Sequence, residues 1–113
     1  MAVPNPDRAI VDPAKLRDYV LSASHPVGRF KALFFVALGY SAEHWEILDA
    51  DLRAHLRSAV VARVEGTPYG QKYAVRGILR GPSGREADVI SVWIVLRDEE
   101  FPRFVTAFPG GAS

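Results

Sequence analysis

Three side chains that can move protons or hold an anion lie within the segment Ser24–Lys31. Histidine side chains ordinarily titrate near neutral pH, so His25 is a candidate for giving or taking a proton during catalysis. Arg29 and Lys31 follow at the expected start of a helix, where unpaired backbone N–H groups and the helix dipole attract anions. Because cations are unfavourable in a first helical turn, these two side chains indicate an anionic ligand such as a phosphate, whose charge they would stabilise.

The same segment also fits a purely structural interpretation. His25 and Pro26 are typical of a turn, because the residue before a proline resists helical geometry. Lys31 is equally typical of a solvated helix residue. The residues of this segment alone leave both interpretations open.

A second polar position is Thr106, in the otherwise apolar run Phe104–Phe108. If Phe104 and Phe108 face the core, Thr106 shares their side of a strand, and a buried hydroxyl requires a hydrogen-bond partner. That partner is either neighbouring backbone or a substrate. Three further side chains fit either the lining of a site or a structural or solvated position: Tyr69, Tyr73 and Arg103.

Familiar catalytic and metal-binding signatures are absent from the sequence, which has no phosphate-binding glycine loop, HExxH, GxSxG or EF-hand loop. The absence of cysteine excludes disulfides, thiolate catalysis and cysteine-bound metals. His44 and His55 lie about 16 Å apart along an expected helix, at 1.5 Å per residue, which is too far to share one ion. We therefore expect no metal and no cofactor, and we expect both histidines to be solvated.

Composition favours one soluble domain. The chain has 113 residues, of which 49% are hydrophobic, which is enough to form a core. The net charge of +1 neither favours nor excludes nucleic acid, since one local basic patch can suffice. No stretch approaches the roughly 18–20 apolar residues that span a membrane, and the N-terminus lacks the apolar core of a signal peptide. We expect a cytoplasmic protein with no membrane association.

The elements that must position these side chains are helical in the first half. Residues 1–11 are expected to form an irregular lead-in. Asp12 and Pro13 then fit the cap and first residue of a helix. A second helix is expected over about 29–38, with Leu33 on its buried face and Gly39 as its stop. The third begins near residue 42 and has a buried stripe formed by Trp45, Leu48, Leu52 and Leu56.

The second half is expected to form strands, because after about residue 57 the hydrophobic period changes from 3.6 to 2. The predicted strands cover about 60–65, 72–80, 87–96 and 101–108, and residues 81–84 form a hairpin turn. Both faces of the third strand are apolar, which predicts a central strand covered on both sides. The fold class is therefore α+β, with three N-terminal helices packed on one face of a four-stranded antiparallel meander. A single domain spans 12–109, and 110–113 form a flexible tail.

Several motifs together resemble an uncharacterised bacterial domain family. They are HPVGRFKALFF (25–35), LGY (38–40), TPYGQKY (67–73), GPSGR (81–85), VWIV (92–95) and PRFVTAFP (102–109). The resemblance covers nearly the whole chain, from about Asp12 to Pro109. The family is similar in turn to barnase–EndoU–colicin–RelE-type toxin ribonucleases, which combine N-terminal helices with a four-stranded antiparallel meander.

This resemblance implies a metal-independent, RNA-cleaving site. By position, His25 would be the acid or base, Lys31 the phosphate stabiliser and Thr106 the contact to the scissile phosphate. Arg29, Tyr69, Tyr73 and Arg103 would bind substrate. Phe108 departs from the pattern, because those toxins often carry a tyrosine there and an aromatic hydroxyl is therefore missing.

Two function classes follow. The first is a ribonuclease-like toxin, whose own cell would need a neutralising partner protein. The second is a non-catalytic binding module, such as an antitoxin-like or accessory protein, for which the final strand could serve as an interface edge.

Overall fold

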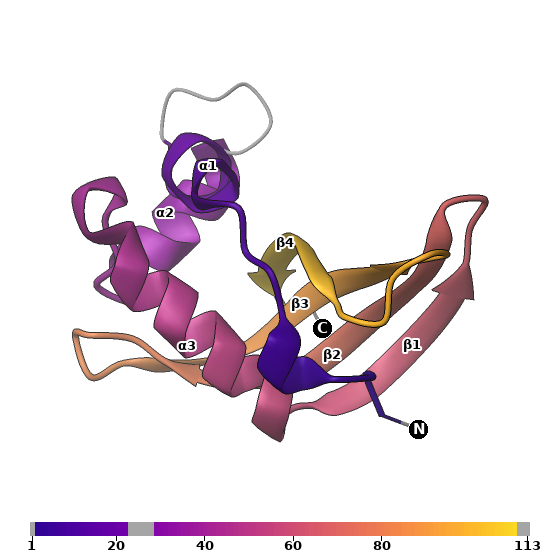
Figure 1. The fold of residues 1–113 in the computed structure, drawn as a ribbon. Coiled ribbons are helices and arrows are strands. Elements are labelled where there is room, and N and C mark those ends of the chain that lie inside the picture. Colours follow the sequence, from indigo (N-terminus) through magenta and orange to yellow (C-terminus); the bar gives the residue numbers. More distant parts are fainter. Residues whose placement is uncertain (1, 23–28, 111–113) are drawn as a thin grey trace.

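The computed structural model describes residues 2–22 and 29–110, with side chains from residue 31 onward in the second range. It is an α+β fold in which the helices lie together beside one antiparallel sheet (Figure 1). The strand order is β1–β2–β3–β4, so the predicted meander is confirmed. The strands are β1 (Val60–Gly66), β2 (Gly70–Arg80), β3 (Glu86–Leu96) and β4 (Arg103–Pro109).

The helical half is less regular than predicted. The first helix begins as predicted, with Asp12 as its cap and Pro13 as its first residue, but α1 spans only Pro13–Lys15 and continues into the π-helical turn η2 (Leu16–Val20). Helices α2 (Arg29–Ala37) and α3 (Trp45–Ser58) are regular, and the single 3-10 turns η1 (Pro6–Arg8) and η3 (Ala42–His44) precede α1 and α3. No helix in the described ranges is long and apolar enough to cross a membrane.

The wider π-helical turn has a packing consequence. It places Leu16, Val20 and Leu21 in the core, each at most 4% exposed. The residue between them, Tyr19, remains partly exposed. The irregular turn thus keeps the Tyr19 side chain partly outside the apolar core.

The segment before α1 is attached to the edge of the sheet. The Ile10 N–H donates to the Pro102 carbonyl, and the Ile10 carbonyl accepts from the Phe104 N–H, both at 2.9 Å. These bonds form a parallel bridge beside Arg103. The lead-in therefore covers part of the outer edge of β4, and its residues Val3, Ala9 and Val11 are buried.

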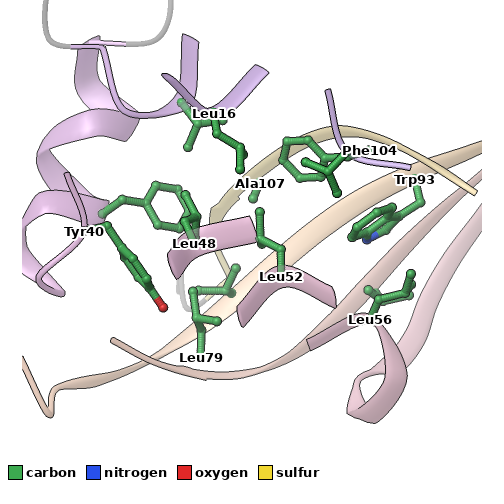
Figure 2. Close-up of a cluster of buried hydrophobic side chains, with 14 of the residues drawn as sticks. Leu16, Tyr40, Leu48, Leu52, Leu56, Leu79, Trp93, Phe104 and Ala107 are labelled. Carbon is green, nitrogen blue, oxygen red and sulfur yellow. The ribbon is translucent and has the colours of Figure 1, made fainter. Parts of the chain in front are cut away.

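The core lies between α3 and one face of the sheet, with the aromatic rings of α2, β3 and β4 around it (Figure 2). Helix α3 contributes Leu48, Leu52 and Leu56, as predicted. Trp93 and Phe104 pack edge to face, with ring centroids 5.3 Å apart. Each fully buried side chain of this size contributes about 1.5–3 kcal/mol to folding.

Helix α2 is rotated relative to the prediction. It buries Ala32 and Phe35, whereas Leu33 is 67% exposed, and Leu38, directly after the helix, is buried as well. Gly39 ends the helix as predicted, with a φ of 103° in the left-handed region that favours glycine. The β2–β3 turn then docks on this end, because the Ser83 N–H donates to the Leu38 carbonyl at 3.1 Å.

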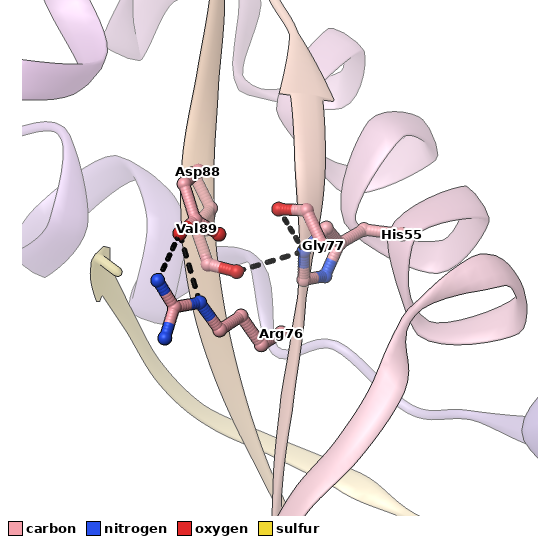
Figure 3. Close-up of polar contacts among 5 residues, drawn as sticks. All are labelled: His55, Arg76, Gly77, Asp88 and Val89. Carbon is pink, nitrogen blue, oxygen red and sulfur yellow. Dashed lines mark hydrogen bonds and ion pairs between the residues drawn. The ribbon is translucent and has the colours of Figure 1, made fainter. Parts of the chain in front are cut away.

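The prediction that His44 and His55 are both solvated was half wrong. His44 is exposed, but His55 is only 2% exposed and packs against the sheet. Its Nε2 lies 3.2 Å from the Gly77 carbonyl and 3.1 Å from the Val89 carbonyl, as Figure 3 shows. Since a carbonyl only accepts, Nε2 carries the proton and donates.

Two hydroxyl-mediated bonds complete this network. The Trp93 indole N–H donates to Ser91 Oγ at 2.8 Å, which leaves the Ser91 hydroxyl to donate to His55 Nδ1 at 3.0 Å. His55 is therefore a neutral, fully bonded core residue. Burial lowers the pKa of His55, against the smaller opposing effect of its two carbonyl bonds.

Candidate functional site

The sheet face that points away from α3 carries a groove of about 410 Å³. All four strands contribute to its lining, and β3 supplies Ile90 and Val92. These two side chains are only partly buried. The prediction that β3 is covered on both sides was therefore wrong within the described structure, because its second apolar face forms the floor of a groove.

A β-bulge in each outer strand determines which side chains reach this face. In β4, Phe104 pairs with Trp93 and Thr106 pairs with Val92, so Val105 is an extra residue. The bulge places Phe104 in the core but turns Thr106 and Phe108 toward the groove. The expectation that Thr106 shares a face with Phe104 was wrong for this reason.

The bulge in β1 has the same effect. Ala62 is its extra residue, because Val61 pairs with Val75 and Arg63 pairs with Ala74. Val61 packs against the core, while Arg63 lines the groove. The simple alternation predicted for this strand therefore changes phase at Ala62.

Basic side chains surround the apolar floor. Arg63 and Lys72 line the groove together with the acidic Glu65. Neither of the two basic groups takes part in any of the ion pairs found among the described residues. On the same face, Arg76 is bound to Asp88 at 2.5 Å (Figure 3). The groove thus offers positive charge above an apolar surface, which suits a ligand that is both anionic and flat.

A three-residue cluster lies at the β4 side of this groove. The Lys31 ammonium of α2 donates to Thr106 Oγ1 at 2.9 Å and to the Tyr19 hydroxyl at 2.8 Å. It also lies 5.0 Å from the centroid of the Tyr19 ring, within the range of a cation–π interaction. Lys31 and Thr106, 75 residues apart in the chain, are therefore in direct contact.

The electrostatics of the cluster favour an acidic phenol. The hydrogen bond from Lys31 lowers the pKa of Tyr19, and a bond with Thr106 and the charge of Lys15 act in the same direction. Burial opposes these effects but does not cancel them. An ammonium held between two hydroxyls can also donate to a phosphate oxygen that enters the groove beside Thr106.

The other predicted site residues are more scattered. His25 lies outside the described residues, as does the side chain of Arg29, although Arg29 begins α2. Tyr69 is 74% exposed in the β1–β2 turn, which extends away from the helices (Figure 1). Tyr73 points toward the core and packs against it. Arg103 shares the groove face in register with Ile94.

Arg103 is already engaged. Its guanidinium donates to both carboxylate oxygens of Glu99, each at 2.7 Å, and lies 5.2 Å from the Phe101 ring. The hydrogen bond from Arg103 lowers the pKa of Glu99. The Arg103 side chain is 41% exposed, so a ligand can compete with Glu99 for the guanidinium.

Sequence reasoning missed Tyr19, Arg63 and Lys72. The spacing of Leu16, Tyr19 and Val20 favours an apolar helical stripe, and only the hydroxyl of Tyr19 indicates another role. The signal for Lys72 was its alternation with core residues of β2, which places it on the face away from the helices. No group of three or more His, Asp and Glu side chains is placed to hold a metal in residues 2–22 and 29–110.

Comparisons with known proteins agree with this fold. A solved structure described as a contact-dependent growth inhibition toxin–immunity protein complex from Klebsiella pneumoniae 342 contains a similar chain, with a TM-score of 0.71 and 21% sequence identity. The similarity covers 92% of this chain and 95% of that one. No curated protein sequence matches. The family model described as "Domain of unknown function (DUF6883)" matches residues 2–111, and the chain therefore belongs to this family.

Proposed function

We propose that this domain is a toxin-like, metal-independent ribonuclease whose site is the groove and the Lys31 cluster beside it. The observation that carries the proposal is the direct contact of Lys31 with Thr106 at the groove, since the family resemblance assigns both residues to one phosphate. The similarity to a chain of a growth-inhibition toxin–immunity complex supports it. The site of action would be cytoplasmic RNA.

The proposed reaction is attack by a ribose 2′-oxygen on the adjacent phosphorus. The bond from phosphorus to the 5′-oxygen breaks, leaving a 2′,3′-cyclic phosphate and a 5′-hydroxyl. Lys31 stabilises the negative charge that develops on the phosphoryl oxygens, and Thr106 contacts the same group. His25 acts as a proton-transfer group and Arg29 as an additional cation.

The groove is suited to the rest of such a substrate. A nucleobase is flat and apolar on its faces, which fits the floor formed by Ile90, Val92 and Phe108. The neighbouring phosphates carry charge that Arg63 and Lys72 can meet at the rim. Base faces are alike, so this arrangement favours RNA binding with little sequence preference.

The test is cleavage of end-labelled tRNA and total RNA in EDTA by the purified protein and its variants. We expect wild-type cleavage that leaves cyclic phosphate ends, and a loss of about 10²–10³-fold in Lys31→Ala, as for removal of one charge-stabilising donor. His25→Ala should lose about 10²–10⁴-fold. Arg85→Ala removes one positive charge at the exposed β2–β3 turn and should cleave normally.

A second candidate is a non-catalytic binding module. The similar chain belongs to a complex of a toxin with an immunity protein, and that pairing fits either component. Expression in cells separates the two functions. A ribonuclease toxin arrests growth unless Lys31 is replaced or a neutralising partner is present. A binding module leaves growth unchanged, both as the wild type and as the Lys31 variant.

A further inference from the structure

The groove on the open face of the sheet runs across the strands rather than along them. Its lining takes only two or three side chains from each strand but includes all four strands. Because β1 and β4 are the outer strands (Figure 1), the groove extends over three strand spacings, about 14 Å in total. A ligand that fills the groove therefore reaches from one edge of the sheet to the other.

One cross-strand row marks the two ends of this path. In order from β4 to β1, the row consists of Thr106, Val92, Ala74 and Arg63. Lys31 holds the Thr106 end through its 2.9 Å hydrogen bond. The row is thus apolar in the middle and cationic at both ends, which fits a chain that carries flat apolar groups between negative charges.

Lys72 adds a second cation at the far end. It is the diagonal neighbour of Arg63 on the same face, since Arg63 pairs with Ala74 and Lys72 pairs with Glu65. Diagonal neighbours lie about 7–8 Å apart, which two long side chains can bridge by meeting at one anion. Neither cation takes part in any ion pair found in the described part of the chain, so both can bind a phosphate.

The floor between these ends favours an unpaired strand. Ile90, Val92 and Phe108 line the groove, and an unpaired base can lay its apolar face on them. In a duplex the base faces are stacked on one another and the phosphates lie outside. A duplex would therefore meet the cations but leave the floor uncovered.

We propose that Arg63 and Lys72 form a second phosphate site, and that the substrate is an unpaired RNA strand that crosses the four β-strands from the Lys31 cluster to this site. The inference rests on the proposed ribonuclease function. The cleaved phosphate lies at Lys31, bases cover the floor, and one phosphate further along the same strand lies at Arg63 and Lys72. Glu65 lines the same end of the groove, so its negative charge weakens the binding of that phosphate.

The closing experiment locates the second phosphate by removing one charge at a time. The substrate is an unpaired DNA oligonucleotide with a single ribonucleotide, which supplies the only 2′-oxygen that can attack. Each member of a substrate set has one phosphate replaced by a neutral methylphosphonate. In the wild type, replacement at one position away from the cleaved bond should raise KM about three- to fivefold, the strength of one exposed ion pair, and leave kcat unchanged.

Arg63→Ala connects that position to one side chain. Arg63 is exposed, so the variant should fold normally. Its KM on the unmodified substrate should rise by the same factor, and the methylphosphonate at the second site should then have no further effect. The slope of log KM against log salt concentration should fall by about 0.7, as for one lost contact to a single-stranded phosphate.

The controls differ from Arg63→Ala in sign or in size. Glu65→Gln removes a repulsive charge, so KM should fall on the unmodified substrate but stay unchanged on the substrate that lacks the second phosphate. Arg85→Ala removes a positive charge at the exposed β2–β3 turn and should match the wild type. A complementary strand annealed to the substrate should slow cleavage at least about tenfold, because paired bases cannot reach the floor.

Two results would overturn the inference while the proposed function stands. The first is that no methylphosphonate position loses its effect in Arg63→Ala, and the second is that the duplex is cleaved as fast as the single strand. If the wild type cleaves none of the substrates, the ribonuclease proposal itself fails. Fluorescence anisotropy of the same labelled strands then tests the phosphate site by binding alone. A loss of affinity at one methylphosphonate position that is absent in Arg63→Ala supports the site, and equal affinities for all strands overturn it.

Discussion

Two polar clusters on opposite faces of the sheet are built from similar parts. On the helix-covered face, His55 of α3 bonds to the Ser91 hydroxyl of β3. On the open side, Lys31 of α2 bonds to the Thr106 hydroxyl of β4. Each cluster joins a nitrogen group on a helix to a hydroxyl on a strand and includes one aromatic side chain, Trp93 or Tyr19.

The difference between them is access to a ligand. His55, Ser91 and Trp93 are at most 2% exposed, and no buried side-chain nitrogen or oxygen lacks a partner among the described residues. Lys31 and Thr106 are only partly buried, and Thr106 lines a groove. Histidine is the residue type most often assigned to catalysis, yet here the described histidine in a polar cluster is structural. Burial and complete bonding, rather than residue type, distinguish the two clusters.

The largest change in stability is expected when His55 is replaced. His55→Ala removes two carbonyl contacts and leaves a cavity, so we expect the free energy of unfolding to fall by about 2–5 kcal/mol. Urea unfolding measures this change. His44→Ala is the matched control on the same segment, exposed in the structure, and should shift stability by less than about 0.5 kcal/mol. Equal losses in the two variants would contradict the structural role of His55.

Removal of the Ser91 hydroxyl should have the next largest effect on stability. Ser91→Ala leaves the Trp93 indole N–H and His55 Nδ1 without their partner, which we expect to cost about 1–3 kcal/mol. The same urea titration detects it, and trypsin resistance provides a second readout. A stability within about 0.5 kcal/mol of the wild type would show that the hydroxyl is dispensable in the core.

A smaller effect should appear when the pH is changed. Burial lowers the pKa of His55 in the folded state, whereas the unfolded chain titrates near 6.5. Below about pH 6.5 the unfolded state binds a proton that the folded state does not, so stability falls as the pH falls. The slope is at most about 1.4 kcal/mol per pH unit, and the contribution is fully present above pH 6.5.

The pH dependence is measured from urea midpoints between pH 5.5 and 7.5. His55→Gln removes the titrating group and should flatten the curve over this interval, while His44→Ala should retain the slope. A wild-type curve that is already flat would show that folding does not lower the pKa of His55.

The smallest effect on stability is expected for Thr106→Val, the counterpart of Ser91→Ala on the open side. Valine preserves the shape of the side chain, and a partly exposed lysine can replace the lost bond with water, so we expect a change within about 0.5 kcal/mol. RNA cleavage should nevertheless fall by at least about tenfold. A large loss of stability with normal cleavage would reverse the assignment of the two clusters.

The sequence predicted the sheet better than the site. Alternating residues such as Lys72, Tyr73 and Val75 gave the strand and its faces, because a period of 2 depends only on local geometry. The bulge at Val105 was not predictable, since it depends on how β4 pairs with β3. The contact of Lys31 with Thr106 was a hypothesis from resemblance, and only the docking of α2 near β4 creates it.

The burial of His55 was missed for a similar reason. On α3 it directly precedes Leu56, at the margin of the apolar stripe, and nothing in the helix alone shows what it meets. Its partners are carbonyls of β2 and β3 and a hydroxyl of β3, more than 20 residues away in the chain. Hydrogen-bond partners that are distant in the chain produce no periodic pattern in the sequence.

The single extra residue in β4 makes the groove tolerant of a one-residue deletion. Side chains along a strand alternate between two sides, and Val105 interrupts this alternation because it opposes no residue of β3. Deletion of the Val105 codon would remove the bulge and leave Phe104 opposite Trp93 and Thr106 opposite Val92. One three-nucleotide deletion would therefore turn an irregular strand into a regular one while Thr106 and Phe108 keep their places at the groove.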